Sequence, residues 1–199
     1  NAEDLTNTSF SINMENPIAA AENVYRITVE SVNHINGEGI ITFNGHIYQI
    51  VDTATTWNSA YEYITTPVEG ECQYTLYGMC GYFANITSES EKNFIIANLG
   101  LNESWYGGSD VRTEGTWEWI DGPEFGINFW TGVGCSGTMN TYSNWMGCEP
   151  NNAGNEDGLQ SYSWGSGEWN DLDINTNNLP FVVEYSPNFT SRTQYLELE

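Results

Sequence analysis

Residues 148–171 read CEPNNAGNEDGLQSYSWGSGEWND, a polar stretch in which carboxylates and side-chain amides alternate. Both groups supply hard oxygen ligands of the type that Ca²⁺ prefers, and the ion takes roughly 6–8 of them at about 2.3–2.6 Å in a geometry that a long loop can provide. The stretch therefore predicts a calcium site built from three carboxylates and two amides. Its candidate ligands are Glu149, Asn151, Glu156, Asn170 and Asp171.

The same alternation predicts what an ion held at the surface would bind. Coordination positions that the protein leaves open can accept vicinal sugar hydroxyls in place of water. Each hydroxyl would give one lone pair to the ion, accept a hydrogen bond from an asparagine amide and donate its proton to a glutamate carboxylate. We therefore expect calcium-dependent carbohydrate binding by these five residues, with Trp164, Trp145 or Tyr162 as candidate faces for stacking on the sugar.

Two helices are predicted on the N-terminal side of this stretch. The first covers residues 57–64, with Thr55-Thr56 as candidate caps. The second covers residues 89–99, where Ser88 is the expected cap and Glu91 stands at the third helical position of a capping box. Both helices are short and would need a sheet to pack against.

Strand patterns account for most of the remaining chain, so the fold class is α+β. Strands are expected at 40–51, 104–107, 115–120, 168–169 and 180–185. The first residues also alternate in a strand-like way, and three segments follow: a β-rich flank at 1–38, a main domain at 39–186, and a C-terminal strand or tail at 187–199. The flank and tail could pair beside the domain or belong to neighbouring modules of a longer chain.

Several motifs along the chain, taken together, resemble the C-type lectin family. The resemblance runs in order from residue 39 to about residue 185. The motifs are FNGHIY at 43–48, WYGG at 105–108, WEWIDG at 117–122, EPN at 149–151, ED at 156–157 and WND at 169–171.

The resemblance implies a C-type lectin-like fold with two helices, antiparallel sheets and a long calcium-binding loop. It also implies a cis peptide bond before Pro150 and, from the Glu-Pro-Asn form, a preference for mannose- or fucose-type sugars. The same resemblance implies a second calcium site formed by Asp110, Glu114, Asn152 and Asp157. One departure is that both disulfides usual in the family are missing, since Gly158 stands where a cysteine is usual.

Charge and hydropathy limit the possible partners. Four Lys and Arg against 27 Asp and Glu give a net charge of −23, which repels nucleic acid and anionic membrane surfaces. No apolar run approaches the roughly 20 residues that cross a bilayer, so direct membrane insertion is not expected. The expected partners are fucose- or mannose-containing glycans on a cell surface.

The four cysteines have two close spacings, and neither is a Cys-x-x-Cys motif. Pairing Cys72 with Cys80 and Cys135 with Cys148 closes short loops, so these local disulfides are preferred over four free thiols. Disulfides indicate an oxidising compartment, and we expect a secreted or cell-surface protein.

Two functions other than sugar binding are possible for a loop rich in carboxylates. A glycosidase would use two carboxylates about 5 Å or about 6.5–9.5 Å apart, but alternating Glu and Asn suits coordination better, and His34 and His46 lie in no nucleophile motif. We therefore expect no enzymatic activity. The other alternative is an adhesion module that uses calcium only to stiffen the loop and binds a protein or ice surface.

Overall fold

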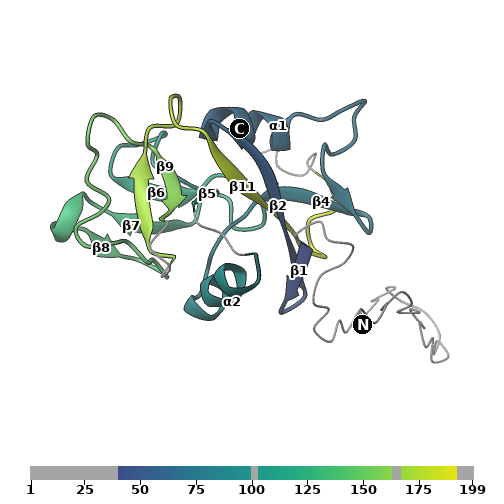
Figure 1. Ribbon diagram of the computed structural model, residues 1–199, viewed down its shortest axis with the longest axis horizontal. Coiled ribbons are helices and arrows are strands. Elements are labelled where there is room, and N and C mark those ends of the chain that lie inside the picture. Colours follow the sequence, from purple (N-terminus) through teal and green to yellow (C-terminus); the bar gives the residue numbers. More distant parts are fainter. Residues whose placement is uncertain (1–39, 100–102, 163–166, 192–199) are drawn as a thin grey trace, which may run out of the picture.

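The structure, a computed structural model, describes residues 40–99, 103–162 and 167–191 (Figure 1). The predicted flank at 1–38, most of the predicted tail and Trp164 lie outside these described residues. Within the described ranges, no helix is long and apolar enough to cross a membrane.

Helix α1 (Trp57–Thr65) begins where the sequence predicts. Thr56 is its cap, with extended backbone and a side-chain oxygen that accepts the Ser59 N–H at 3.2 Å. This bond satisfies one of the amides that a helix start leaves unpaired. Trp57, Ala60 and Ile64 share one buried face, which attaches the short helix to the sheet.

Helix α2 (Glu89–Leu99) also has its predicted bounds, but one capping contact differs from the prediction. Ser88 caps it as expected, accepting the Glu91 N–H at 3.2 Å. The Glu91 carboxylate, however, accepts from the Thr87 N–H at 2.8 Å and from the Tyr48 hydroxyl at 2.5 Å instead of completing a capping box with the Ser88 amide. Tyr48 comes from a strand, so tertiary packing has taken over this carboxylate.

In the described part of the chain, eleven strands form one branched sheet, and nearly all of its pairings are antiparallel, as predicted. The main path runs β1-β2-β11-β5-β6-β7-β8, while β4 joins β11, β3 joins β4, β9 joins β5, and β10 joins β9. An exception to the antiparallel prediction is the pairing of β11 with β5, which is parallel at Phe181 and Trp105. Strand β11 lies between β2 and β5 in the sheet. The strands are β1 (Ile40–Phe43), β2 (His46–Thr55), β3 (Thr75–Leu76), β4 (Met79–Phe83), β5 (Ser104–Ser109), β6 (Thr116–Trp119), β7 (Asn128–Thr131), β8 (Thr138–Met139), β9 (Gly158–Ser161), β10 (Trp169–Leu172) and β11 (Leu179–Tyr185).

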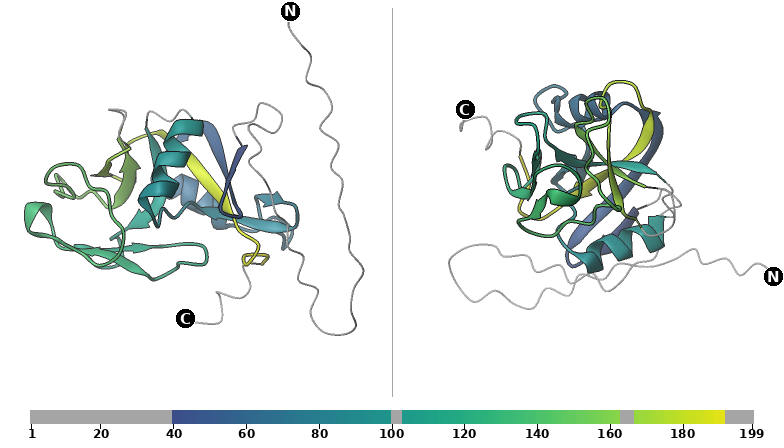
Figure 2. Two further views of the ribbon diagram at one scale, coloured as in Figure 1. Left: turned by 90° about the horizontal axis from the view of Figure 1, so that it is seen from below. Right: turned by 90° about the vertical axis from the view of Figure 1, so that its left-hand side faces the viewer.

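The two helices lie on opposite sides of β2 and β11 (Figure 2). Strand β11 shows why: Phe181 and Val183 pack in the cluster that contains Trp57 of α1, whereas Val182 packs in the cluster that contains Ile95 of α2. Successive side chains of a strand point to opposite faces, so a continuous apolar run serves two cores.

A buried glutamate on β11 interrupts this apolar run. Glu184 is 1% exposed, contacts the His46 imidazole of β2 and accepts the Asn85 N–H at 3.0 Å. Burial raises the pKa of Glu184 to about 7, although the His46 hydrogen bond opposes this rise. The hydrogen bond to Glu184 in turn raises the pKa of His46.

We expect this pair to make the fold less stable as the pH rises. Both pKa values are raised in the folded state, so the stabilisation is complete below the unfolded values and is lost as pH rises through the folded ones. Each unit by which the folded pKa exceeds the unfolded pKa changes the free energy of unfolding by about 1.4 kcal/mol. For Glu184, whose pKa rises from 4.5 to about 7, the loss of stability is therefore on the order of 3 kcal/mol.

Urea denaturation at pH 5 and pH 8 would measure this, with Glu184→Gln beside the unchanged protein. The variant cannot ionise, so its free energy of unfolding should depend less on pH. Equal pH dependence in the two proteins would contradict the assignment.

Candidate functional site

The loop between β8 and β9 carries most of the predicted ligands and lies at the end of the molecule formed by β7 and β8 (Figure 1). The predicted disulfide Cys135–Cys148 joins the short helical turn Gly134–Ser136, which precedes β8, to the residue before Glu149, with Cα atoms 4.4 Å apart. The second predicted disulfide, Cys72–Cys80, is also present, with a Cα separation of 5.6 Å. Both cysteine pairings are confirmed.

A cluster of tryptophans packs between the loop and the sheet. Trp145 packs edge-to-face on Trp117, with ring centroids 4.7 Å apart, and on Trp169 of β10, at 5.9 Å. The backbone N–H of Trp169 also donates to the Asn144 carbonyl at 2.8 Å, and the backbone N–H of Met146 donates to the Trp169 carbonyl at 2.9 Å. Trp145 thus belongs to the supporting core, and it holds the loop next to β10.

Asp171 of β10 connects the two principal motifs. Its side chain is fully buried, and its two oxygens accept the backbone N–H groups of Asn151 at 3.1 Å and Asn152 at 2.7 Å. Twenty positions separate the first of these amides from the aspartate. One carboxylate therefore sets the path of the Glu-Pro-Asn segment, and Asn170, its neighbour, bonds to Gln160 of β9 at 3.1 Å.

The Glu149 carboxylate lies close to other acids. The Glu149–Pro150 peptide bond is cis, as the family resemblance implied. Burial, the neighbouring Asp171 carboxylate and the Glu156 charge together raise the pKa of Glu149 to about 7, while a backbone hydrogen bond from Asn151 opposes them. The Glu149 Oε2 atom is buried without a hydrogen-bond partner.

Glu156 completes the primary set from the far side of the loop. Its Oε2 accepts the Ala153 N–H at 2.9 Å, and its own N–H donates to the Asn152 side chain at 2.8 Å. Burial raises the pKa of Glu156, and Asp171 and Asp173 raise it further. Asp173 was not predicted from sequence. Its place two residues after Asp171, directly after the end of β10, is the signal that could have indicated it.

The second predicted set is partly assembled around Asp110, which directly follows β5 and is 2% exposed. Its Oδ2 accepts the Gly115 N–H at 2.9 Å, and its Oδ1 is buried without a partner. Burial and the charges of Glu114 and Asp157 together raise the pKa of Asp110 to about 7, while the Gly115 hydrogen bond opposes the rise. These three acids are therefore neighbours.

The remaining member, Asn152, is turned to the primary set instead. Its side-chain oxygen accepts the Glu156 N–H, and its φ is +50°. Asp157 meanwhile accepts from the Asn155 amide at 2.8 Å, a contact that was not predicted. Asn152 therefore lies between the two sets and belongs to neither alone.

All nine predicted ligands offer oxygen atoms, and two buried carboxylate oxygens among them have no partner, which fits a hard cation such as calcium. Even so, in the described part of the chain no three His, Cys, Asp or Glu side chains are grouped as a ready metal site. Asp171 and Glu156 take backbone amides as partners in this arrangement. Amide oxygens of Asn151 and Asn170 would have to complete the coordination.

Comparison with known proteins places the chain among lectin domains. A family model for the lectin C-type domain matches residues 69–182. Halomucin of Haloquadratum walsbyi is 34% identical over 152 residues, which are 75% of this chain and 2% of halomucin. The chain spans less than two thirds of the length of its first relatives, reaching 61% for a perlucin-like protein of Mytilus galloprovincialis.

Solved structures agree on the fold. The cow C-type carbohydrate-recognition domain of CD23, crystallised in the presence of GlcNAc2Man3 oligosaccharide, is 25% identical with a TM-score of 0.53 and covers 77% of this chain and 96% of its own. A calcium-independent type II antifreeze protein shares the fold at 20% identity and a TM-score of 0.55, covering 80% of this chain and 98% of its own. The family match extends over more than half of the sequence, and we conclude that this chain belongs to the C-type lectin domain family.

Proposed function

We propose that this chain binds carbohydrate through a calcium ion held by Glu149, Asn151, Glu156, Asn170 and Asp171, with specificity for mannose- or fucose-type sugars. The observation that carries the proposal is the position of Asp171. A fully buried carboxylate orders the Glu-Pro-Asn segment through two backbone amides, beside a glutamate oxygen that lacks a partner. An unpaired carboxylate oxygen beside a second carboxylate supports a cation site at this position.

Each residue type has a separate task in this proposal. Calcium, when bound, supplies Lewis acidity toward two sugar hydroxyls. Glu149 and Glu156 accept hydroxyl protons in hydrogen bonds, and Asn151 and Asn170 donate amide hydrogens to the hydroxyl oxygens. Asp171 anchors the loop through its two backbone hydrogen bonds, and in this proposal its carboxylate is also an ion ligand. Nothing in this set requires a bond to be broken, so we propose binding without catalysis.

The proposed setting is outside the cell, on a secreted or surface-attached protein. Two disulfides support an oxidising compartment. The small share of halomucin that the chain covers supports a module within a longer adhesive chain. A shallow site for two hydroxyls gives weak binding, so useful adhesion would come from several modules acting together.

The competing function is an adhesion module that uses calcium only to stiffen the loop and binds a protein or ice surface without sugar recognition, and the antifreeze protein of the same fold is a reason to test it. A glycan array probed with calcium and with EGTA separates the two. The proposal predicts binding to mannosylated or fucosylated glycans that disappears in EGTA. Calcium-saturated protein that is folded and binds no glycan would favour the adhesion module.

The Glu-Pro-Asn segment should also set which sugar binds. Exchanging donor and acceptor in the double variant Glu149→Gln, Asn151→Asp is expected to change the ratio of galactose to mannose affinity by about tenfold or more, because the hydroxyl pair must match the new arrangement. Inhibition of glycan binding by the two free sugars measures the ratio. Glu69→Gln with Asn178→Asp, an exposed pair outside the loop, makes the same chemical change and should leave the ratio unaltered. An unchanged ratio in the loop variant would mean that other contacts choose the sugar.

A further inference from the structure

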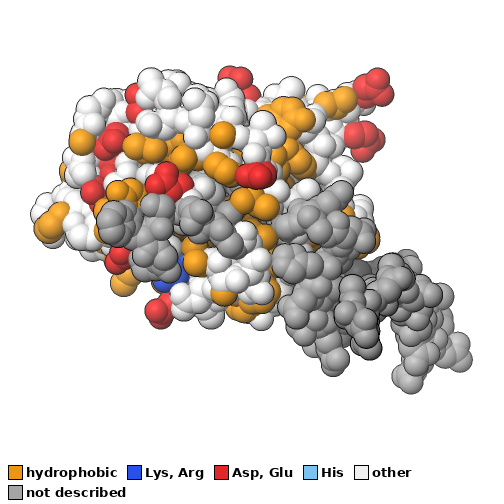
Figure 3. Space-filling model, in the orientation of Figure 1, with side chains coloured by type: hydrophobic (Ala, Val, Ile, Leu, Met, Phe, Trp, Pro, Cys, Tyr) orange, Lys and Arg blue, Asp and Glu red, His pale blue; other side chains and the backbone are white. Residues whose placement is uncertain are grey.

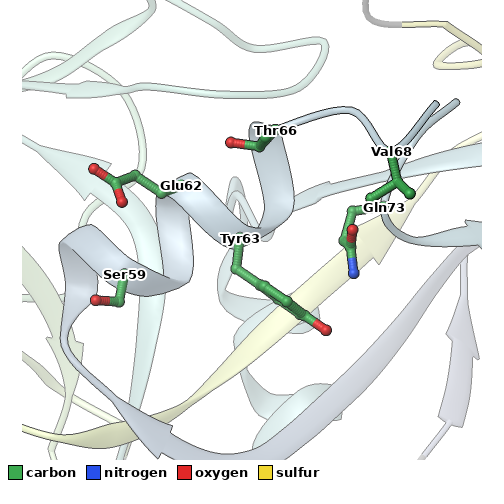
Figure 4. Close-up of a pocket in the computed structure, with 6 residues that line it drawn as sticks. All are labelled: Ser59, Glu62, Tyr63, Thr66, Val68 and Gln73. Carbon is green, nitrogen blue, oxygen red and sulfur yellow. The ribbon is translucent and has the colours of Figure 1, made fainter. Parts of the chain in front are cut away.

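A second concave surface lies between helix α1 and the loop that follows it, at the other end of the molecule from the β8–β9 loop (Figures 1 and 4). Its volume is about 290 Å³, close to the lower limit of roughly 300 Å³ for small-molecule sites. The lining residues are Ser59, Glu62, Tyr63, Thr66, Val68 and Gln73. None of them belongs to the proposed calcium sites.

The wall opposite α1 is held in place by covalent and hydrogen bonds. Val68 and Glu71 exchange two backbone hydrogen bonds of 2.9 Å each across a tight turn. The Cys72–Cys80 disulfide then attaches this loop to β4, and the Gly81 N–H donates to the Tyr74 carbonyl at 2.9 Å. A wall held in this way loses little entropy when a ligand binds.

Tyr63 provides an aromatic surface that is open to solvent and supported from behind. Its side chain is 53% exposed and projects from α1 toward Val68 and Gln73 (Figure 4). The ring meets Tyr74 edge-to-face, with centroids 5.6 Å apart, and Tyr74 meets buried Phe181 in the same manner at 6.3 Å. The exposed ring is therefore connected to the core by a row of aromatic contacts.

The polar groups around this ring favour a neutral ligand with many hydroxyls. Ser59 and Thr66 offer hydroxyls, Gln73 an amide and Glu62 a carboxylate, so the surface can both donate and accept hydrogen bonds. None of the six lining residues is a lysine or arginine, and acidic side chains stand at the outer edge of the loop (Figure 3). Phosphates and acidic sugars would be repelled by this surface and by the net charge of −23.

We propose that this surface is a second saccharide subsite, independent of calcium, for a neutral pyranose of the gluco configuration. Equatorial hydroxyls leave C–H groups on both faces of such a ring, and one face can lie on Tyr63 while the edge hydroxyls meet Glu62 and Gln73. The inference goes beyond the calcium-dependent function and does not rest on it. With sites at both ends, one chain could join two glycans.

The test uses tri-N-acetylchitotriose and the full chain, isotope-labelled for NMR, in EGTA. Saturable shifts are expected within residues 57–76, with a Kd on the order of 1 mM. Tyr63→Ala should weaken binding by about tenfold or more. Tyr77→Ala is the matched control. Tyr77 is 68% exposed, lies between β3 and β4 and does not line the pocket, so this variant should bind the trisaccharide as the unchanged chain does.

Gln73→Ala tests the proposed hydrogen bond to the sugar independently of the aromatic contacts. This variant should weaken trisaccharide binding about threefold or more. The proposal is overturned by the absence of saturable shifts, by shifts centred on residues 149–156, or by equal losses in Tyr63→Ala and Tyr77→Ala. Titration of the same samples with methyl α-mannoside and calcium reads the β8–β9 loop separately. Failure at one site therefore leaves the result at the other unaffected.

Discussion

Asp171→Asn is expected to lower calcium affinity by about 100-fold or more and to abolish calcium-dependent sugar binding. The substitution removes one negative charge and replaces one acceptor oxygen by an amide donor. The Asn151 or Asn152 N–H then faces another donor in a site that is fully buried. An unpaired buried amide costs about 1–3 kcal/mol, so the Glu-Pro-Asn segment should also lose its position.

Isothermal titration with calcium and retention on immobilised mannose would measure both losses. Asp173→Asn is the matched control, since Asp173 lies two residues along, is only half-buried and accepts from Asn175 rather than from the loop. It should change calcium affinity less than about threefold, as expected for a charge that acts only at a distance. Equal losses in the two variants would indicate a general charge effect, and wild-type binding by Asp171→Asn would exclude the proposed ligand set.

Calcium is expected to raise the melting temperature by roughly 5–10 °C when its concentration is about 100 times its Kd. At that ratio a ligand that binds only the folded state contributes about 2.7 kcal/mol, and the same ion would neutralise carboxylates whose pKa values are now raised by burial and by one another. Calorimetry with calcium, with EGTA and with magnesium measures the effect.

The controls for this second prediction follow from the site. Magnesium demands a smaller, more regular octahedron and should raise the Tm much less. Asp171→Asn should not respond to calcium at the same concentration, whereas Asp173→Asn should. An identical Tm in calcium and EGTA would show that the loop is stable without an ion and would contradict the proposed calcium site.

Local features of this chain could be predicted because their causes are local. The starts of both helices follow from Thr56 and Ser88, whose side chains cap amides three residues ahead. The two disulfides follow from short spacings that leave few other geometries. The cis bond before Pro150 was not worked out from the residues and came from the family resemblance.

Strand β9 shows where local reasoning ends. Its residues, GLQS, are all buried, yet they show neither alternation nor a strong β propensity. The strand exists because β5 and β10 flank it on both sides and supply its hydrogen bonds. Gly158 illustrates the same dependence, since a Cβ there would lie 2.8 Å from Ile174, a distance set by packing alone.

The candidate site divides in the same way. Residue types and short spacings were enough to predict the candidate oxygen ligands, the order of the motifs, the caps and the cysteine pairs. The fold was needed to show that Asp171 anchors the loop, that Asp173 acts on Glu156, that Trp145 packs against the core and that Glu91 bonds to Tyr48. These contacts join residues brought together by sheet pairing and core packing, and the free energy that selects them comes from the whole fold.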